Sequence, residues 1–204
     1  MPAGREPVPF VGLTGGLGAG KSEALQALGE LGAATLSTDA VVHELLLSDE
    51  MRDAVIERFG PEVAPAGSLD RTRIAERVFG DDEARSWLEG VLWPRVGERV
   101  SLWRAAVDTA EPAPRAAVVE VPLLFESGME TAFDATIAVV ADESLRRERA
   151  SARGHAAADE RAGRQLSQDE KAQRADFLVR NDGTLDELRQ ALSRVLAKLD
   201  STPS

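Results

Sequence analysis

The 204-residue chain contains no cysteine. A disulfide framework and thiolate chemistry are therefore both excluded. The sequence also lacks any apolar run of about 18 residues, and its first residues, MPAGREPVP, contain no apolar segment of the kind that a secretory signal needs. We therefore expect neither a signal peptide nor a membrane span, and a cytoplasmic location.

Positive charge is also scarce. Lys and Arg together number 24 against 35 Asp and Glu, which gives a net charge of −11. Nucleic acids and anionic membranes would be repelled at long range, so neither is an expected partner. The length and the hydrophobic content of 43% are sufficient for one sizeable core with a small subdomain.

One glycine-rich stretch carries the strongest functional signal. An apolar run from Val8 to Leu13 predicts a buried strand, and a helical pattern begins just after the glycines. Together they form the strand–loop–helix setting of the phosphate loop G-x-x-x-x-G-K-[ST]. Backbone N–H groups of such a loop, with the N-terminus of the following helix, surround phosphate oxygens. The loop residues are Gly15, Gly16, Leu17, Gly18, Ala19, Gly20, Lys21 and Ser22.

Lysine is the rarer of the two basic residues, and its use at the loop is informative. Only Lys21, Lys171 and Lys198 are lysines. A compact ammonium group fits a phosphate cradle better than the planar guanidinium of arginine. We expect Lys21 to reach the β- and γ-phosphates of a nucleoside triphosphate, and the Ser22 hydroxyl to ligate Mg²⁺.

The remaining apolar runs predict the fold. Short runs at 34–36, 116–121, 135–140 and 177–179 are continuous rather than alternating, which is typical of parallel strands covered on both faces. Helical patterns fill 49–104, the arginine-rich stretch 142–174 and a last helix from Thr184, where Glu187 completes a capping box. These elements predict an α/β doubly wound fold, a parallel sheet flanked by helices, with a helical insertion in which the three tryptophans pack in the core.

Two carboxylates follow strands of this sheet. The carboxyl ends of adjacent parallel strands border one crevice, so we expect Asp39 to face the phosphate loop and to accept a proton from an attacking hydroxyl. A helix N-cap is the structural alternative for Asp39. Glu120 ends another strand and is predicted to hold Mg²⁺ through water, the alternative being a solvent-facing position.

Basic side chains of two helices complete the candidate set. Arg146, Arg149 and Arg153 lie at helical spacing and predict a stripe that neutralises charge during phosphoryl transfer. A solvated face paired with neighbouring acidic residues is the alternative. His43 follows Asp39 by four residues and could touch a substrate phosphate, although an isolated histidine is more often structural or exposed.

The motifs taken together resemble those of dephospho-coenzyme A kinases, in order along nearly the whole chain. VGLTGGLGAGKSE is similar to the first motif of that family, and Val121 to Glu126, reading VPLLFE, to its central signature. Further similarity is carried by Gly32-Ala33, 36–39, Phe59-Gly60, 67–71, 143–154, Gln165, Lys171, 175–176, Asn181 and Gly183. Ser37, Glu23, His43 and Trp93 depart from the family pattern.

The resemblance implies a P-loop kinase core at about 8–39, 116–141 and 175–204, a helical CoA-binding region at about 40–110 and an arginine-bearing lid at about 142–174. It implies ATP-dependent phosphorylation of the ribose 3′-hydroxyl of dephospho-CoA, with Asp39 as the base and Lys21 and Arg149 assisting transfer. Nucleotide contacts would come from the loop, from Arg153, from Asn181 and from the backbone of Glu23. Substrate contacts would come from Asp39, His43, Arg71, Pro122 and Leu123.

Three other functions compete with this interpretation. Another small-molecule kinase, such as a nucleoside monophosphate kinase, would use the same donor loop with a different acceptor pocket. A GTPase switch would require an N-K-x-D stretch, which the sequence lacks. A nucleotide-binding protein without catalysis is suggested only by the departures at Glu23 and Trp93. The sequence does not predict an oligomeric state.

Overall fold

The computed structural model describes residues 7–152 and 165–201 and divides the chain into two compact units. The smaller unit spans Thr38–Leu102, and the larger unit contains the rest of the chain. The helical region expected at about 40–110 corresponds to the smaller unit and to the end of the helix that leaves it.

The larger unit is built on a parallel sheet. Within the described residues its strands are β1 (Phe10–Gly15), β2 (Ala34–Ser37), β3 (Ala117–Glu120), β4 (Ala135–Val140) and β5 (Phe177–Arg180), in the order β2-β3-β1-β4-β5. All four pairings are parallel. β3 and β4 are buried at every position, as expected for continuous apolar strands covered on both faces. The predicted parallel α/β fold is confirmed.

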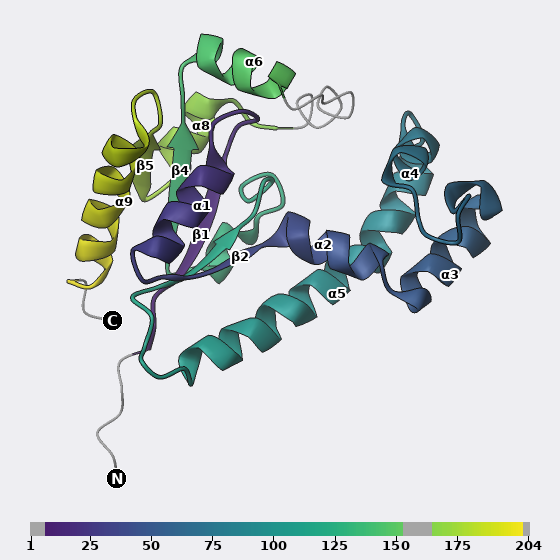
Figure 1. Cartoon of the computed structure of the whole chain (residues 1–204), viewed down its shortest axis with the longest axis horizontal. Helices are drawn as coiled ribbons and strands as arrows, with labels where there is room; N and C mark the ends of the chain where they lie inside the picture. Colours follow the sequence, from purple (N-terminus) through teal and green to yellow (C-terminus); the bar gives the residue numbers. More distant parts are fainter. Residues whose placement is uncertain (1–6, 153–164, 202–204) are drawn as a thin grey trace. The chain divides into compact units, whose positions relative to one another are not determined.

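Helices cover both faces of the sheet. α1 (Lys21–Glu30) and α9 (Leu185–Leu199) pack together on one face (Figure 1), where their apolar side chains share a core with Val11, Leu13 and Ile137. On the other face Trp103 and Val107, from the end of α5 (Asp82–Asp108), pack with Phe10 and Ala117. α8 (Gln168–Arg174) packs against β1 and β4, and the short 3₁₀ helix η2 spans Met129–Ala132.

Side chains fix the ends of several elements. The capping box predicted at Thr184 and Glu187 is confirmed, since each side chain binds the other residue's backbone N–H. Asp176 joins β5 to β4: its Oδ2 accepts hydrogen bonds from the N–H and the hydroxyl of Thr136 at 2.8 and 2.7 Å. The Asp176 N–H donates back to the Thr136 hydroxyl at 3.1 Å, which fixes the start of β5 beside β4.

The smaller unit is helical, as predicted. It contains α2 (Thr38–Leu46), α3 (Asp49–Phe59), the 3₁₀ helix η1 (Pro61–Val63), α4 (Arg71–Val78) and the larger part of α5. Its core is formed by buried apolar residues from these helices, namely Leu46, Met51, Val55, Val63, Ile74 and Leu92. No helix in the part of the chain that the structure describes, α5 included, is both long and apolar enough to cross a membrane.

The longest helix differs from expectation at one tryptophan. α5 runs through Pro94 as one continuous helix, although proline removes one backbone hydrogen bond. Core packing was predicted for all three tryptophans. Trp87 packs edge-on against Phe59 with ring centroids 5.3 Å apart, and Trp103 packs against the sheet, but Trp93 is 40% exposed, so that prediction is wrong for Trp93.

Candidate functional site

The phosphate loop connects the end of β1 at Gly15 to the start of α1 at Lys21. Gly20 is the N-cap of α1 and adopts the left-handed conformation, with φ of 89° and ψ of 31°. The Gly20 carbonyl accepts from the Ala24 N–H at 3.0 Å, but glycine has no side chain that could cap the N–H groups of the first turn of α1. The helix N-terminus is therefore suited to an anionic ligand such as a phosphate group.

Two glycines are required by close packing around the loop. A Cβ at Gly18 would overlap the backbone carbonyl of Arg146, and a Cβ at Gly20 would overlap the Asn181 side-chain amide. Both glycines have positive φ, which other residues rarely adopt. The loop is thus enclosed by the helix α6 (Glu143–Ala152) and by the residue that follows β5.

Lys21 and Ser22 lie together at the start of α1. The Lys21 ammonium donates hydrogen bonds to the carbonyls of Gly15 and Gly16, at 3.1 and 3.2 Å. The positive charge is therefore held against the loop itself, and Ser22 is exposed next to it. This arrangement can present both a cation and a hydroxyl to a bound triphosphate.

Glu120 belongs to β3, which pairs directly with β1, the strand that leads into the phosphate loop. It ends β3, lies beside Leu13 of β1 and Ser37 of β2, and is 6% exposed. The solvent-facing alternative for Glu120 is therefore wrong. A serine hydroxyl and a carboxylate are hard oxygen donors of the type Mg²⁺ prefers, and Mg²⁺ usually needs only one or two protein oxygens beside water and phosphate. The donor set fits the ion, although the described residues hold no group of three or more His, Asp or Glu that would bind a metal on their own.

The arginines of α6 contact the loop and its surroundings. Arg146 donates from Nε to the carbonyl of Leu17 at 2.8 Å, and it also pairs with Glu143 at 2.8 Å. Arg149 donates from Nη1 to the carbonyl of Asn181 at 3.1 Å. Two arginines of the predicted stripe thus lie on the face of α6 that meets the loop, and Arg153 lies outside the described residues.

Asn181 supports the loop at Ala19. Its buried side-chain amide donates to the carbonyl of Ala19 at 3.1 Å, and its backbone N–H donates to the carbonyl of Val140 at 2.8 Å. The residue was predicted as a nucleotide contact. In the structure its amide binds the loop backbone, which holds the shape of the loop.

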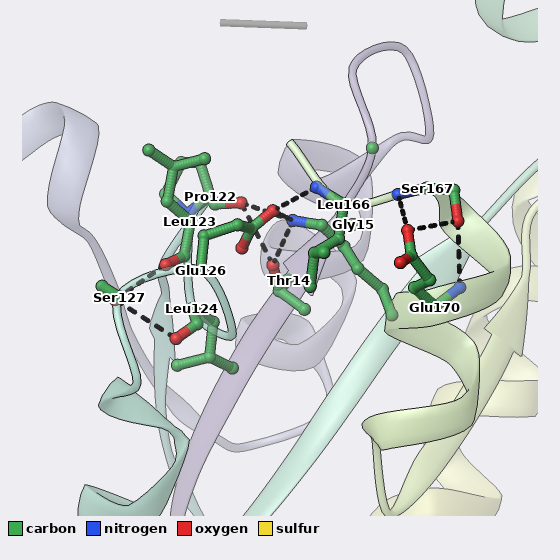
Figure 2. A network of polar contacts seen from close by, with 12 residues as sticks. Thr14, Gly15, Pro122, Leu123, Leu124, Glu126, Ser127, Leu166, Ser167 and Glu170 are labelled. Atoms are coloured by element: carbon green, nitrogen blue, oxygen red, sulfur yellow. Dashed lines mark hydrogen bonds and ion pairs between the residues drawn. The ribbon is translucent and has the colours of Figure 1, made fainter. Parts of the chain in front are cut away.

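The segment that follows β3 lies close to the end of β1. The carbonyl of Pro122 accepts hydrogen bonds from the Lys171 ammonium at 2.7 Å and from the Thr14 hydroxyl at 3.3 Å. The carbonyl of Leu123 accepts one from the Ser127 hydroxyl at 2.7 Å (Figure 2). Pro122 and Leu123 are both half-buried and are thus held on the same side of the sheet end as Thr14.

Lys171 matches a position of the family pattern, but the sequence did not show which residues it binds. Its side chain is 0% exposed, and its ammonium pairs with Glu126 Oε1 at 2.9 Å. Burial lowers the pKa of Lys171, and the hydrogen bond and charge of Glu126 counteract that effect. The scarcity of lysine that drew attention to Lys21 applies equally to Lys171 and could have identified it.

The other predicted substrate residues belong to the smaller unit. Asp39 and His43 lie one turn apart on α2 and are both exposed, so they share one face of that helix. Arg71 is the first residue of α4 and is also exposed; the side chain of the preceding Asp70 caps this helix.

Comparisons with known proteins give one consistent result. Residues 9–187 match the family model described as dephospho-CoA kinase. The chain is 39% identical over 194 residues to the dephospho-CoA kinase of Protochlamydia amoebophila, covering 93% of this chain and 95% of that protein. It is 38% identical over 195 residues to the dephospho-CoA kinase of Deinococcus radiodurans, covering 94% and 93%.

Solved structures agree on the architecture. A crystal structure from Thermus thermophilus aligns with a TM-score of 0.76 and 32% identity, covering 95% of this chain and 98% of that one. The dephospho-CoA kinase from Campylobacter jejuni aligns with a TM-score of 0.64 at 24% identity, covering 95% and 98%. The second similarity supports the fold alone.

Proposed function

The chain belongs to the dephospho-CoA kinase family, and we propose that it transfers the γ-phosphoryl group of ATP to the ribose 3′-hydroxyl of dephospho-CoA. The products would be CoA and ADP, and the reaction would be the last step of CoA biosynthesis. The observation that carries the proposal is the family match over residues 9–187, because it includes the phosphate loop, the helical unit and the arginine-bearing helix in one alignment.

The proposed donor site is the phosphate loop. Its supporting features are the N-terminus of α1, where the N-cap residue Gly20 makes no side-chain cap, the Lys21 ammonium held on the loop, and two arginines of α6 that contact the loop and its support. In phosphoryl transfer the protein acts mainly by positioning and by neutralising charge on the transferred group. Lys21 and Arg149 are the residues we assign to this charge, with Arg153 as a further nucleotide contact.

The proposed acceptor chemistry depends on Asp39. Its carboxylate would accept the proton of the 3′-hydroxyl while the hydroxyl oxygen bonds to the γ-phosphorus and the bond to the ADP oxygen breaks. Ser37, the last residue of β2, replaces an acidic residue of the family motif, so Asp39 is the only carboxylate of that motif. We assign His43, Arg71, Pro122 and Leu123 to the binding of dephospho-CoA.

Mg²⁺ is part of this proposal. The Ser22 hydroxyl and Glu120, directly or through water, would hold it, and the ion would supply positive charge to the phosphate oxygens of ATP. Glu120 is well suited because its carboxylate is buried at the end of a strand next to the loop strand.

An acceptor panel tests the function. The purified protein is given ATP and Mg²⁺ with dephospho-CoA or with a nucleoside monophosphate, and ADP release is followed by a coupled assay. The proposal predicts release with dephospho-CoA that exceeds release with AMP, CMP or UMP by at least about 100-fold, equal to about 2.7 kcal/mol of transition-state discrimination. Faster release with a nucleoside monophosphate would instead support the alternative kinase.

A further inference from the structure

We propose that Lys171 and Glu126 form a positioning pair for phosphoryl transfer. The pair holds three parts of the chain in one arrangement: β1, which leads into the phosphate loop, the segment that follows β3, and the start of α8. The inference rests on the proposed kinase function and adds two residues to it. Neither residue is assigned a contact with ATP or with dephospho-CoA.

The pair holds the donor side of the site. The Lys171 ammonium lies 2.7 Å from the carbonyl of Pro122 and 3.4 Å from the hydroxyl of Thr14, the residue directly before Gly15 of the phosphate loop. The Thr14 hydroxyl donates to the same Pro122 carbonyl at 3.3 Å. One buried cation therefore connects the start of the loop to the segment that we assign to substrate binding.

The same pair holds the chain where it returns to the core. Glu126 Oε1 accepts from Lys171 and also from the backbone N–H of Leu166 at 2.8 Å (Figure 2). Leu166 lies two residues before α8, where Ser167 and Glu170 form a capping box. Glu126 thus anchors the residue that precedes α8, while Lys171 anchors α8 itself.

Gln168 extends this anchor to the residue before α6. Its side-chain amide forms two hydrogen bonds with the backbone of Ala141, accepting from the N–H and donating to the carbonyl, both at 2.9 Å. Ala141 lies between β4 and α6, and α6 carries Arg146 and Arg149. Ala141 before α6 is therefore bound by Gln168 of α8, and Leu166 before α8 is bound by Glu126, the ion-pair partner of Lys171.

Burial of these charges requires an explanation beyond stability. Lys171 is completely buried, and Glu126 is 12% exposed with its Oε2 lacking a hydrogen-bond partner among the described residues. An apolar pair of similar volume would pack here without desolvating two charges. The ion pair, however, orients these parts of the chain through directional hydrogen bonds, which an apolar pair cannot do.

The expected consequence concerns turnover more than binding. Displacement of reacting groups by about 1 Å can reduce the rate about 100-fold. The loop would still offer its N–H groups to ATP when the pair is removed, because Lys21, Asn181 and the N-terminus of α1 do not depend on it. Loss of the pair should therefore lower kcat and change KM little.

The test uses three variants. The first is a double variant that combines Lys171→Met and Glu126→Gln, the second is the single variant Glu126→Gln, and the third is the control Lys198→Met. The double variant leaves no unpaired buried charge and keeps an amide oxygen for the Leu166 N–H. Lys198 is a lysine on the exposed side of α9, so its replacement by methionine repeats the same chemical change away from the site. The kcat and the KM values for ATP and dephospho-CoA are measured for each folded protein, together with its melting transition.

We expect kcat of the double variant to fall about 10- to 100-fold, with both KM values within about threefold of wild type, and Lys198→Met to stay within about twofold in all three constants. A double variant with wild-type kcat overturns the proposal, as does a raised KM at unchanged kcat. If the double variant shows no cooperative melting, Glu126→Gln decides: a fall in kcat supports the pair, and wild-type kcat overturns it. A wild-type protein that fails to phosphorylate dephospho-CoA refutes the proposed function itself, and the inference falls with it.

Discussion

The glycine that ends the phosphate loop provides the sharpest test of the local geometry. Replacement of Gly20 by alanine should destabilise the protein through two separable effects. The first is the left-handed backbone, which costs an L-residue about 1–2 kcal/mol. The second is the overlap of the new Cβ with the Asn181 side-chain amide, an overpacking effect of about 1–3 kcal/mol. We therefore expect Gly20→Ala to lower the free energy of unfolding by about 2–5 kcal/mol.

Gly128 offers a matched control in the same unit. It is also a left-handed N-cap, with φ of 69° and ψ of 18°, but a Cβ there would meet nothing within 4 Å. Gly128→Ala should therefore show the backbone effect alone, about 1–2 kcal/mol. The difference between the two variants isolates the contact with Asn181.

A double-mutant cycle then tests the contact directly. Asn181→Ala should cost about 1–3 kcal/mol, because it leaves the buried carbonyl of Ala19 without its hydrogen bond. In that background the closest overlap of the Cβ at position 20 is removed and only the end of the Glu23 side chain, with Oε2 at 2.9 Å, has to move, so Gly20→Ala should be about 1–3 kcal/mol less harmful than in the wild type. Urea unfolding followed by circular dichroism measures all four free energies. Equal effects of Gly20→Ala and Gly128→Ala, or additive effects in the cycle, would mean that the overlap with Asn181 does not destabilise the protein.

Three further predictions concern stability. Thr184→Ala should lower the free energy of unfolding by about 0.5–2 kcal/mol in urea titrations, since it removes the N-cap of α9. Backbone and hydroxyl hydrogen bonds from Thr184 lower the pKa of Glu187 below its usual 4.5. The stabilisation by the Glu187 carboxylate is therefore fully present above pH 4.5 and is lost as the pH falls through the pKa of the folded state. The difference in unfolding free energy between wild type and Glu187→Gln should shrink on acidification. Asp176→Ala should cost about 2–3 kcal/mol, because it leaves the buried N–H and the hydroxyl proton of Thr136 without an acceptor; a loss below about 0.5 kcal/mol would contradict that role.

Local patterns were sufficient for much of the fold. The strand β1, the loop and α1 could be predicted because apolar runs, glycines and a helical period lie next to each other in the sequence. The same holds for the capping box of α9, which depends on two residues three positions apart. Continuous apolar runs also predicted a parallel sheet, since such a sheet is covered on both faces.

Contacts between distant residues could not be predicted in this way. The ion pair of Lys171 and Glu126 and the hydrogen bond from Arg146 to Leu17 connect residues 45 and 129 positions apart. Neither contact produces a periodic pattern, because each depends on how two separate segments meet at the end of the sheet. The support of the loop by Asn181 is of the same kind. Lys171 and Asn181 both match positions of the family pattern, but neither match shows which residues they bind.

The identity of the phosphorylated product decides whether the proposed reaction is correct. Purified protein is incubated with ATP, Mg²⁺ and dephospho-CoA, and the product is identified by mass and by its phosphorus resonances, with Asp39→Asn measured in parallel. We expect the wild type to form CoA that carries the new phosphate on the ribose 3′-oxygen, and the variant to form it at least about 100-fold more slowly at nearly unchanged ATP affinity. No CoA from the wild type, or a phosphate at another position, would contradict the proposed reaction.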